Sequence, residues 1–182
     1  METNSVLKNW SLAFLCLALI GVGTFSYLES GTDKLSVNKL NVLASSEKKT
    51  TILTLNPENI TVKKGVETFV TINIDTNEDS VSAVETKLSY NPKIIEVVDI
   101  TPGSFFEKPN VLERTIDQKQ GSVTFTLGGI RAKQGTGIIA KIKIKSLQKG
   151  NSALSLEGSR IAAIQKSSNV LKEASVGSII IE

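Results

Sequence analysis

The chain has 182 residues, with 21 Lys and Arg against 18 Asp and Glu, which gives a formal net charge of +3 at pH 7. It contains no histidine, one cysteine and one tryptophan, so most of the side chains that ligate metals or act as nucleophiles are missing. The small positive charge is scattered along the sequence and does not form the basic footprint of a nucleic-acid-binding protein. This composition favours a binding role at a membrane or with an extracellular partner over catalysis, and we expect no cofactor and no metal site.

The N-terminal segment is the most apolar part of the chain. Residues 12–28 carry no charge, and as a helix rising ~1.5 Å per residue they would span about 25 Å, close to the ~30 Å hydrocarbon core of a bilayer. Trp10 and Tyr27 are placed like interfacial anchors, and Cys16, the only cysteine, lies between them. We predict that residues 1–28 form a single transmembrane anchor, with a cleaved signal peptide as the alternative.

Residues 29–50 are polar and rich in Ser, Lys, Asn and Thr. Such a segment buries too little apolar surface to offset its ordering entropy, so we predict a flexible linker there. The remaining residues, 51–182, are numerous enough for one domain with its own core and no disulfide.

The pattern of residues 51–182 is that of an all-β domain. Apolar residues recur with a period of two, turn residues follow at short intervals, and no stretch keeps a helical spacing for long. Many short strands with this spacing are typical of a β-sandwich. The predicted strands are 52–55, 60–63, 68–75, 83–90, 94–101, 111–117, 122–127, 138–146, 153–157, 161–165 and 176–181, some of which merge.

Alternation within two of these strands assigns their faces. The residues predicted to point inward are Val84, Leu88, Tyr90, Val123, Phe125 and Leu127. The residues predicted to point outward are Glu85, Lys87, Ser89, Ser122, Thr124 and Thr126. A third strand places Lys141, Lys143 and Lys145 in a row, which we interpret as an exposed or edge strand protected from aggregation rather than as a polyanion site.

Two segments resemble ligand-binding loops only in part. Residues 75–79 have the Asp-x-Asn-x-Asp spacing of a calcium loop, but Ser80 and Thr86 stand where that loop needs Gly and a bidentate Glu. A polar hairpin loop is the favoured interpretation, with weak calcium binding as the alternative. The glycine-rich residues 128–137 lack the helix and the Gly-Lys-Ser ending of a phosphate loop, so we predict a mobile loop.

The adjacent Phe105 and Phe106 present a choice between core and patch. We favour core packing, because two neighbouring aromatic rings rarely both stay in water; an exposed hydrophobic patch is the alternative. Carboxylate pairs such as Glu107 and Glu113 are interpreted as surface charges, since nothing in the sequence sets the separation that glycoside hydrolysis requires.

Residues 88–106, Leu-Ser-Tyr-Asn-Pro-Lys-Ile-Ile-Glu-Val-Val-Asp-Ile-Thr-Pro-Gly-Ser-Phe-Phe, describe two strands, the Asn-Pro turn between them and a Pro-Gly-Ser turn after them. This stretch resembles the cohesin family, and the resemblance extends more weakly over residues 51–182. It implies a nine-stranded jelly-roll β-sandwich with no catalytic activity. It also implies a dockerin-like protein partner, bound through the flat outer face of one sheet, and a domain displayed outside the cytoplasm.

The resemblance, carried over strand by strand, predicts a partner-binding set. Its members are Glu85, Lys87, Arg114 (with Glu113 as the other choice in that strand), Thr124, Thr126 and Arg131. Asn91 stands where the family usually has Asp, a change that a turn tolerates. The leading hypothesis is a membrane-tethered module that docks a dockerin-like partner at the cell surface, in connection with polysaccharide degradation. The alternatives are a carbohydrate-binding module of the same superfamily and a structural or adhesion domain of the envelope.

Overall fold

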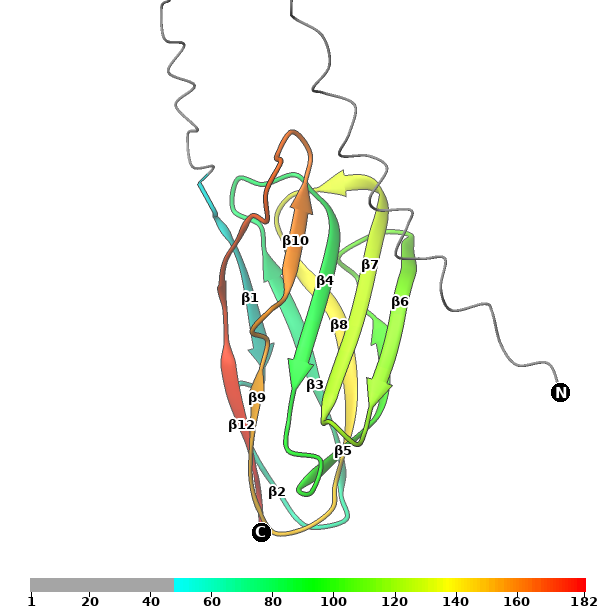
Figure 1. Ribbon diagram of the computed structural model, residues 1–182, viewed down its shortest axis with the longest axis vertical. Helices are drawn as coiled ribbons and strands as arrows, with labels where there is room; N and C mark the ends of the chain where they lie inside the picture. The colour runs from blue at the N-terminus through cyan, green and yellow to red at the C-terminus, as the bar shows by residue number, and fades with distance from the viewer. Residues whose placement is uncertain (1–47) are drawn as a thin grey trace, which may run out of the picture. The chain divides into compact units, whose positions relative to one another are not determined.

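The computed structural model describes residues 48–182, which form a sandwich of two β-sheets (Figure 1). The predicted anchor, residues 1–28, and nearly all of the predicted linker lie outside the described residues. Within residues 48–182, no helix is long and apolar enough to cross a membrane. Thr50, which the prediction placed in the linker, is buried and bonded to the domain.

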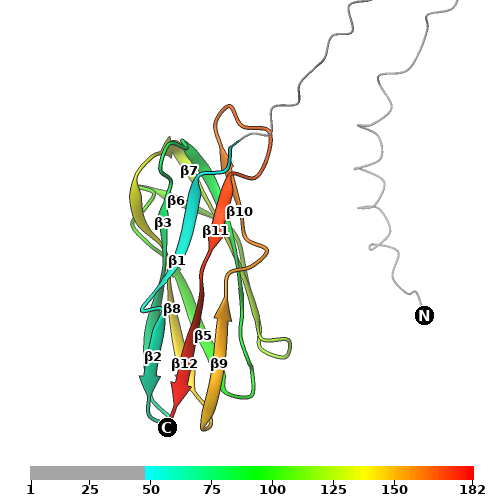
Figure 2. The same cartoon turned by 90° about the vertical axis from the view of Figure 1, so that its left-hand side faces the viewer.

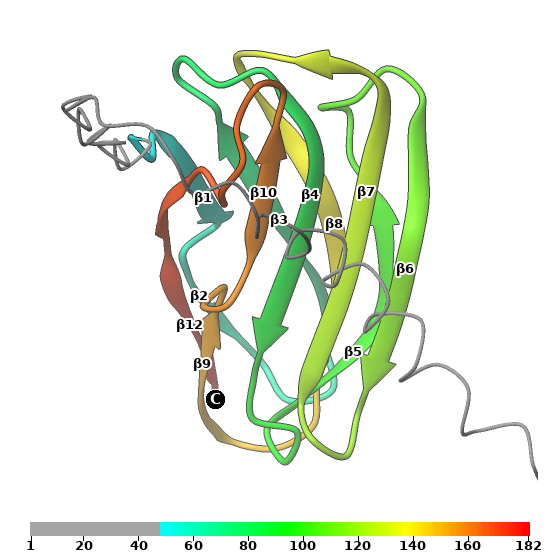
Figure 3. The same ribbon diagram turned by 45° about the horizontal axis from the view of Figure 1, so that its top comes forward.

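Twelve strands make up the two sheets. The five-stranded sheet has the order β11 (Leu171–Ala174), β1 (Thr51–Asn56), β3 (Glu67–Asp75), β8 (Thr136–Ser146) and β5 (Ile95–Pro102). The seven-stranded sheet has the order β2 (Asn59–Val62), β12 (Val176–Ile181), β9 (Gly150–Ser155), β4 (Val81–Ser89), β7 (Ser122–Lys133) and β6 (Pro109–Asp117), and β10 (Arg160–Ala163) also pairs with β4. Figures 1 and 3 show β10, β4, β7 and β6 side by side in front of β3 and β8.

The C-terminal segment joins both sheets. β11 pairs in parallel with β1, and after Ser175 the chain crosses to the other sheet, where β12 lies between β2 and β9 (Figure 2). Ser175 donates its N–H to the carbonyl of Leu53 at 2.9 Å, and its Oγ accepts the N–H of Leu55 at 2.9 Å. Two hydrogen bonds therefore hold the crossover to β1, and the last strand pairs within the other sheet.

The inner faces of both sheets supply one continuous apolar core. The predicted inward residues of β4 and β7 are all buried, as are Phe105 and Phe106. Their two rings meet edge to face with centroids 4.8 Å apart. The predictions of alternating faces and of core packing for this aromatic pair are confirmed, so neither ring forms an exposed patch.

Three details differ from the sequence predictions. The domain has twelve strands rather than about nine, because β2, β10 and β11 are short strands that pair separately. The prediction missed β11, since Leu-Lys-Glu-Ala shows no alternation and is held by pairing with β1. The lysine-bearing strand β8 is exposed on its outer face but is not an edge, because β3 and β5 flank it.

The prediction of a mobile loop over residues 128–137 is wrong. β7 continues to Lys133 and β8 begins at Thr136, so only a short turn around Gly135 joins them. Position 129 needs a glycine because the Phe106 ring lies against it. A Cβ built there would lie 2.4 Å from a ring carbon. Gly129 therefore serves close packing of a strand, whereas Gly135, at a φ of 104°, supplies the left-handed backbone of the turn.

Candidate functional site

The outer face of β10, β4, β7 and β6 brings most of the predicted partner-binding residues together, and we refer to it as the docking face. Cross-strand pairing aligns its side chains in rows, because directly opposed residues in antiparallel strands point to the same side. One row contains Arg160, Glu85, Thr126 and Glu113, one residue from each strand. The next row contains Lys87, Thr124 and Thr115. At the usual ~4.8 Å between strands, the four-residue row is about 14 Å wide.

Glu85 and Lys87 form the one ion pair that the docking face shows among the described residues. The Nζ of Lys87 lies 3.1 Å from Oε1 of Glu85, and both side chains are partly exposed. Such a pair contributes little to stability, at most about 1 kcal/mol, because water screens it. Its effect is local neutralisation. The carboxylate of Glu85 pairs with Lys87 of the same strand and not with Arg160, which stands opposite it on β10.

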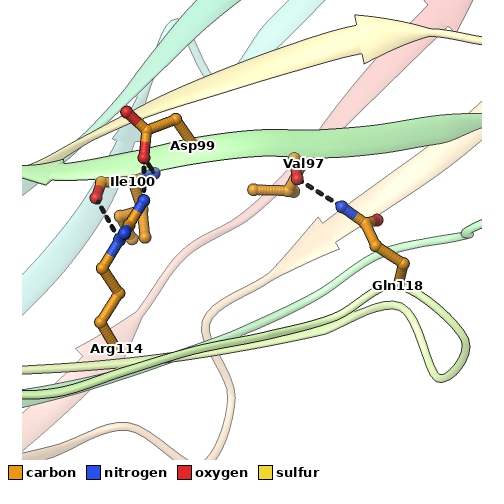
Figure 4. A network of polar contacts seen from close by, with 5 residues as sticks. All are labelled: Val97, Asp99, Ile100, Arg114 and Gln118. Atoms are coloured by element: carbon orange, nitrogen blue, oxygen red, sulfur yellow. Dashed lines mark hydrogen bonds and ion pairs between the residues drawn. The ribbon is translucent and has the colours of Figure 1, made fainter.

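Arg114 does not belong to the docking face. It stands opposite the buried Phe125, so its side chain turns to the inner side of β6 and reaches β5 (Figure 4). There its Nε donates to the carbonyl of Ile100 at 3.0 Å, and its guanidinium also pairs with Asp99. The placement of Arg114 among the outward residues is therefore wrong, and Glu113, the other choice in that strand, takes its position.

A second side chain also connects the two sheets at the edge where β6 and β5 face each other, which we call the seam. Gln118 donates its amide N–H to the carbonyl of Val97 (Figure 4). Its Oε1 accepts the hydroxyl of Tyr90 at 2.7 Å. Burial raises the pKa of the Tyr90 hydroxyl, so this group stays a protonated donor. Arg114 and Gln118 thus donate hydrogen bonds to two carbonyls of the edge strand β5. Those carbonyls could otherwise pair with an added strand from another chain.

The docking face also holds apolar side chains that the sequence prediction missed. A bulge between Val111 and Glu113 leaves Leu112 unpaired and 59% exposed. Leu112 lies over Gly128, where an added Cβ would come within 3.3 Å of its Cδ1. Alternation alone could not have found Leu112, because the bulge changes the register of β6. Ile130, further along β7, is 80% exposed.

Two hollows border the docking face, one over β10, β4 and β7 and the other at the end of β7. One hollow, of about 600 Å³, is lined by Glu85, Thr126, Arg160 and Lys166 together with neighbouring residues. The other, of about 490 Å³, is lined by Lys108, Ile130, Arg131 and Lys133 among others. Arg131 therefore lies in a strand at the margin of the docking face and not in a loop, and Arg160 is a further cation that the prediction did not include.

The calcium-like sequence at residues 75–79 is a structural turn. Asp79 is buried and accepts hydrogen bonds from the hydroxyls of Thr50 at 2.6 Å and Thr51 at 2.9 Å. Asn77, at a φ of 49°, donates its side-chain amide to the carbonyl of Thr50 at 2.7 Å. These groups tie the start of β1 to the turn, which supports a polar structural turn. The turn is not the predicted hairpin, because it connects β3 of one sheet to β4 of the other. Among residues 48–182, no cluster of three or more His, Cys, Asp or Glu side chains could hold a metal ion.

Comparison with known proteins agrees with the fold. The family model for the cohesin domain matches residues 53–181. No curated protein sequence matches the chain. Among solved structures, a non-cellulosomal cohesin from the archaeon Archaeoglobus fulgidus shares 21% identity at a TM-score of 0.60, with 74% of this chain and 91% of that chain covered.

Two further structures show the same architecture. The first belongs to a type I cohesin–dockerin complex from Clostridium thermocellum and shares 16% identity, at a TM-score of 0.61, over 72% of this chain and 93% of that chain. The second is the cohesin module of a family 33 glycoside hydrolase from Clostridium perfringens, with 14% identity and a TM-score of 0.58 over 72% and 95% of the two chains. The resemblance predicted from residues 88–106 is confirmed.

Proposed function

The chain belongs to the cohesin family, and from that premise we propose that it docks a dockerin-like module of another protein through the docking face. Its N-terminal segment, residues 1–28, would hold the domain at the cell membrane with the sandwich outside the cytoplasm, or direct its secretion if cleaved. Cohesin domains are non-catalytic protein–protein interaction modules, which confirms the prediction that the chain is not an enzyme.

The observation that carries the proposal is the make-up of the docking face. Four adjacent strands present threonines, an internally neutralised Glu85–Lys87 pair and the exposed apolar side chain of Leu112 on one surface. Exposed apolar side chains beside polar ones are the usual composition of a protein–protein interface. Solved relatives include cohesins in complex with dockerins, which supports the same kind of partner for this chain.

We propose that the partner, and not this domain, makes the contact with polysaccharides. One solved relative is a module of a glycoside hydrolase, and we propose that the partner of this chain acts on a polysaccharide. Direct glycan binding usually uses exposed Trp or Tyr rings. Among residues 48–182, Phe69 is the exposed aromatic residue and Tyr90 is buried, so no specific observation favours the carbohydrate-binding alternative.

A capture experiment tests the proposal. The full chain, solubilised in mild detergent and immobilised, is incubated with an extract of the source cells, and bound proteins are identified by mass spectrometry. We expect proteins that carry a dockerin module, captured by wild type and lost with Thr126→Arg, a bulky change at the centre of the docking face. Thr54→Arg, an exposed position on β1 of the other sheet, serves as the matched control and should capture the same proteins. Retention on an insoluble polysaccharide without any dockerin-bearing partner would contradict the proposal.

A further inference from the structure

The docking face carries more uncompensated positive than negative charge near its two hollows. Within residues 48–182, ion pairs below 4.0 Å join Lys87 to Glu85, Arg114 to Asp99 and Lys143 to Glu67. Arg160, Lys166 and Arg131 make no such pair in the described part of the chain, although all three are exposed. The docking face thus contains cations that nothing within the domain neutralises.

The hollow beside β10 is basic on balance. Arg160 and Lys166 line it together with a single carboxylate, that of Glu85, which already pairs with Lys87 at 3.1 Å. Thr126 adds a hydroxyl on the floor of β7. An acidic side chain entering here would meet a guanidinium and a hydroxyl, an arrangement suited to charge-assisted hydrogen bonds with a carboxylate.

The hollow at the end of β7 repeats this chemistry. Lys108, Arg131 and Lys133 line it with one carboxylate, that of Glu107. The Nζ of Lys133 also lies 5.4 Å from the centroid of the Phe105 ring, within cation–π distance. Both hollows therefore offer cations in excess of carboxylates.

Along β7, Gly128 lies between Thr126, which lines the first hollow, and residues 129–133, which line the second. Ala162, Ala83 and Gly128 form the row next to Arg160 and Glu85, and Leu112 covers Gly128. Ile130 stands 80% exposed in the wall of the second hollow. A partner that fills both hollows would therefore also cover Leu112. Complementary charge at the rim steers association and suppresses wrong partners.

We infer that the partner of this chain presents an acidic contact surface, with carboxylates that enter the Arg160 and Arg131 hollows on either side of an apolar side chain packed against Leu112. This inference rests on the proposed function, since it specifies the chemistry of the module that docks on the same face. Arg160 and Arg131 act as specificity-determining residues. Glu113, at the β6 end of the four-residue row, is the one exposed carboxylate of that row without an ion pair in the described residues, and it sets the side from which acidic groups are excluded.

A display library tests the inference with a defined probe. A dockerin module from the solved Clostridium thermocellum complex is displayed on yeast with its exposed positions randomised, and is selected against the full chain in detergent. We expect binders of wild type to be enriched in Asp and Glu over Lys and Arg by about threefold or more, and binders of the Arg131→Glu, Arg160→Glu double variant to show the reverse preference. A matched double variant, Lys141→Glu with Lys145→Glu, makes the same change in net charge on the other sheet and should select the same acidic binders as wild type.

The outcomes separate the inference from its premise. Binders that are neutral or basic, or a preference that does not change in the double variant, would overturn the inference and leave dockerin docking intact. If no library member binds wild type, both fail together. For one selected binder, Arg160→Gln and Arg131→Gln should each raise Kd by about 5- to 30-fold, while Lys141→Gln should change Kd by less than about twofold. Equal unfolding midpoints for the three variants exclude a folding defect as the cause.

Discussion

The outer faces of the two sheets handle charge in different ways. On the five-stranded sheet, Lys143 on β8 pairs with Glu67 on β3 at 2.7 Å, and Lys145 stands opposite both Glu67 and Glu96. On the docking face, Arg160 stands directly opposite Glu85, yet Glu85 pairs with Lys87 and leaves Arg160 unmatched. One face is largely neutralised by cross-strand acidic residues, and the other keeps cations available for a partner.

This difference indicates which sheet is built for binding. Cross-strand opposite charges stabilise a sheet modestly, by roughly 0.2–1 kcal/mol for each pair, and they use up the charge that a partner would need. The outer face with Lys143 and Glu67 uses its charges in this way, to stabilise the sheet. The docking face departs from it, and departures from local stabilisation are expected at functional sites.

The largest effect should come from blocking one face and not the other. Thr126→Arg places a bulky cation in the middle of the docking face, and we expect the Kd for a captured dockerin module to rise by about 100-fold or more, a loss of about 2.7 kcal/mol or more. Thr54→Arg, on the five-stranded sheet, should leave Kd unchanged. Isothermal titration calorimetry of both variants measures this contrast, and equal losses would show that the partner does not distinguish the two faces.

Two adjacent glycines of β7 should differ in their effect on stability, because one faces the core and the other the docking face. Gly129→Ala should lower the free energy of unfolding by about 2–4 kcal/mol, because its Cβ would lie 2.4 Å from the Phe106 ring and 2.8 Å from the carbonyl of Arg131. Gly128→Ala points outward and meets Leu112 at 3.3 Å, so the cost should be below about 1 kcal/mol. Urea unfolding of both variants checks the order, which the opposite ranking would contradict.

Glu113 and Arg114, neighbours in β6, should separate binding from stability. Arg114→Ala removes the contacts with Asp99 and the carbonyl of Ile100, and we expect a loss of about 1 kcal/mol in the free energy of unfolding with no change in Kd. Glu113→Ala should leave stability unchanged and alter Kd by a few fold. Denaturation and titration of the same two samples measure both quantities, and a binding defect confined to Arg114→Ala would place the interface on the seam instead.

The smallest effect concerns pH and the five-stranded sheet. The hydrogen bond from Lys143 holds the pKa of Glu67 below its usual range. Because the folded pKa is lowered, the stabilisation is present above the unfolded value of about 4.3 and is lost as the pH falls through the folded pKa. Lys143→Gln should move the Glu67 pKa upward toward the unfolded value, as measured by NMR titration of the carboxyl carbon, with no effect on partner binding. A pKa that stays lowered in this variant would mean that another cation is responsible.

Much of the sandwich could be predicted from period-two alternation, because the inward residues of β4 and β7 form the core wherever the ladder is regular. The prediction failed where tertiary contacts override local pattern. The bulge in β6 moves Leu112 onto the docking face and turns Arg114 away from it, and a bulge leaves no mark in the alternation before its partner strand is known. The glycines at 128 and 129 look like a loop in the sequence, but the Phe106 ring beside Gly129 requires the missing side chain.

The same reasoning explains the unpredicted part of the candidate site. Arg160 joins the docking face only because β10 returns to pair with β4, and residues so far apart in the chain cannot be matched by spacing. Glu85, Lys87, Thr124 and Thr126 could be predicted, since they alternate with buried residues in two regular strands that are also paired with each other. Long-range pairing, and not side-chain type, limits what the sequence indicates about this face.

Lysine footprinting can show which face the partner covers, because both faces carry lysines. The full chain is acetylated with and without a captured dockerin-bearing protein, and the modified positions are quantified by mass spectrometry. We expect Lys87 and Lys166 to become protected in the complex while Lys141 and Lys145 react as before. Protection of Lys141 and Lys145, with Lys87 and Lys166 unchanged, would place the partner on the five-stranded sheet and contradict the account.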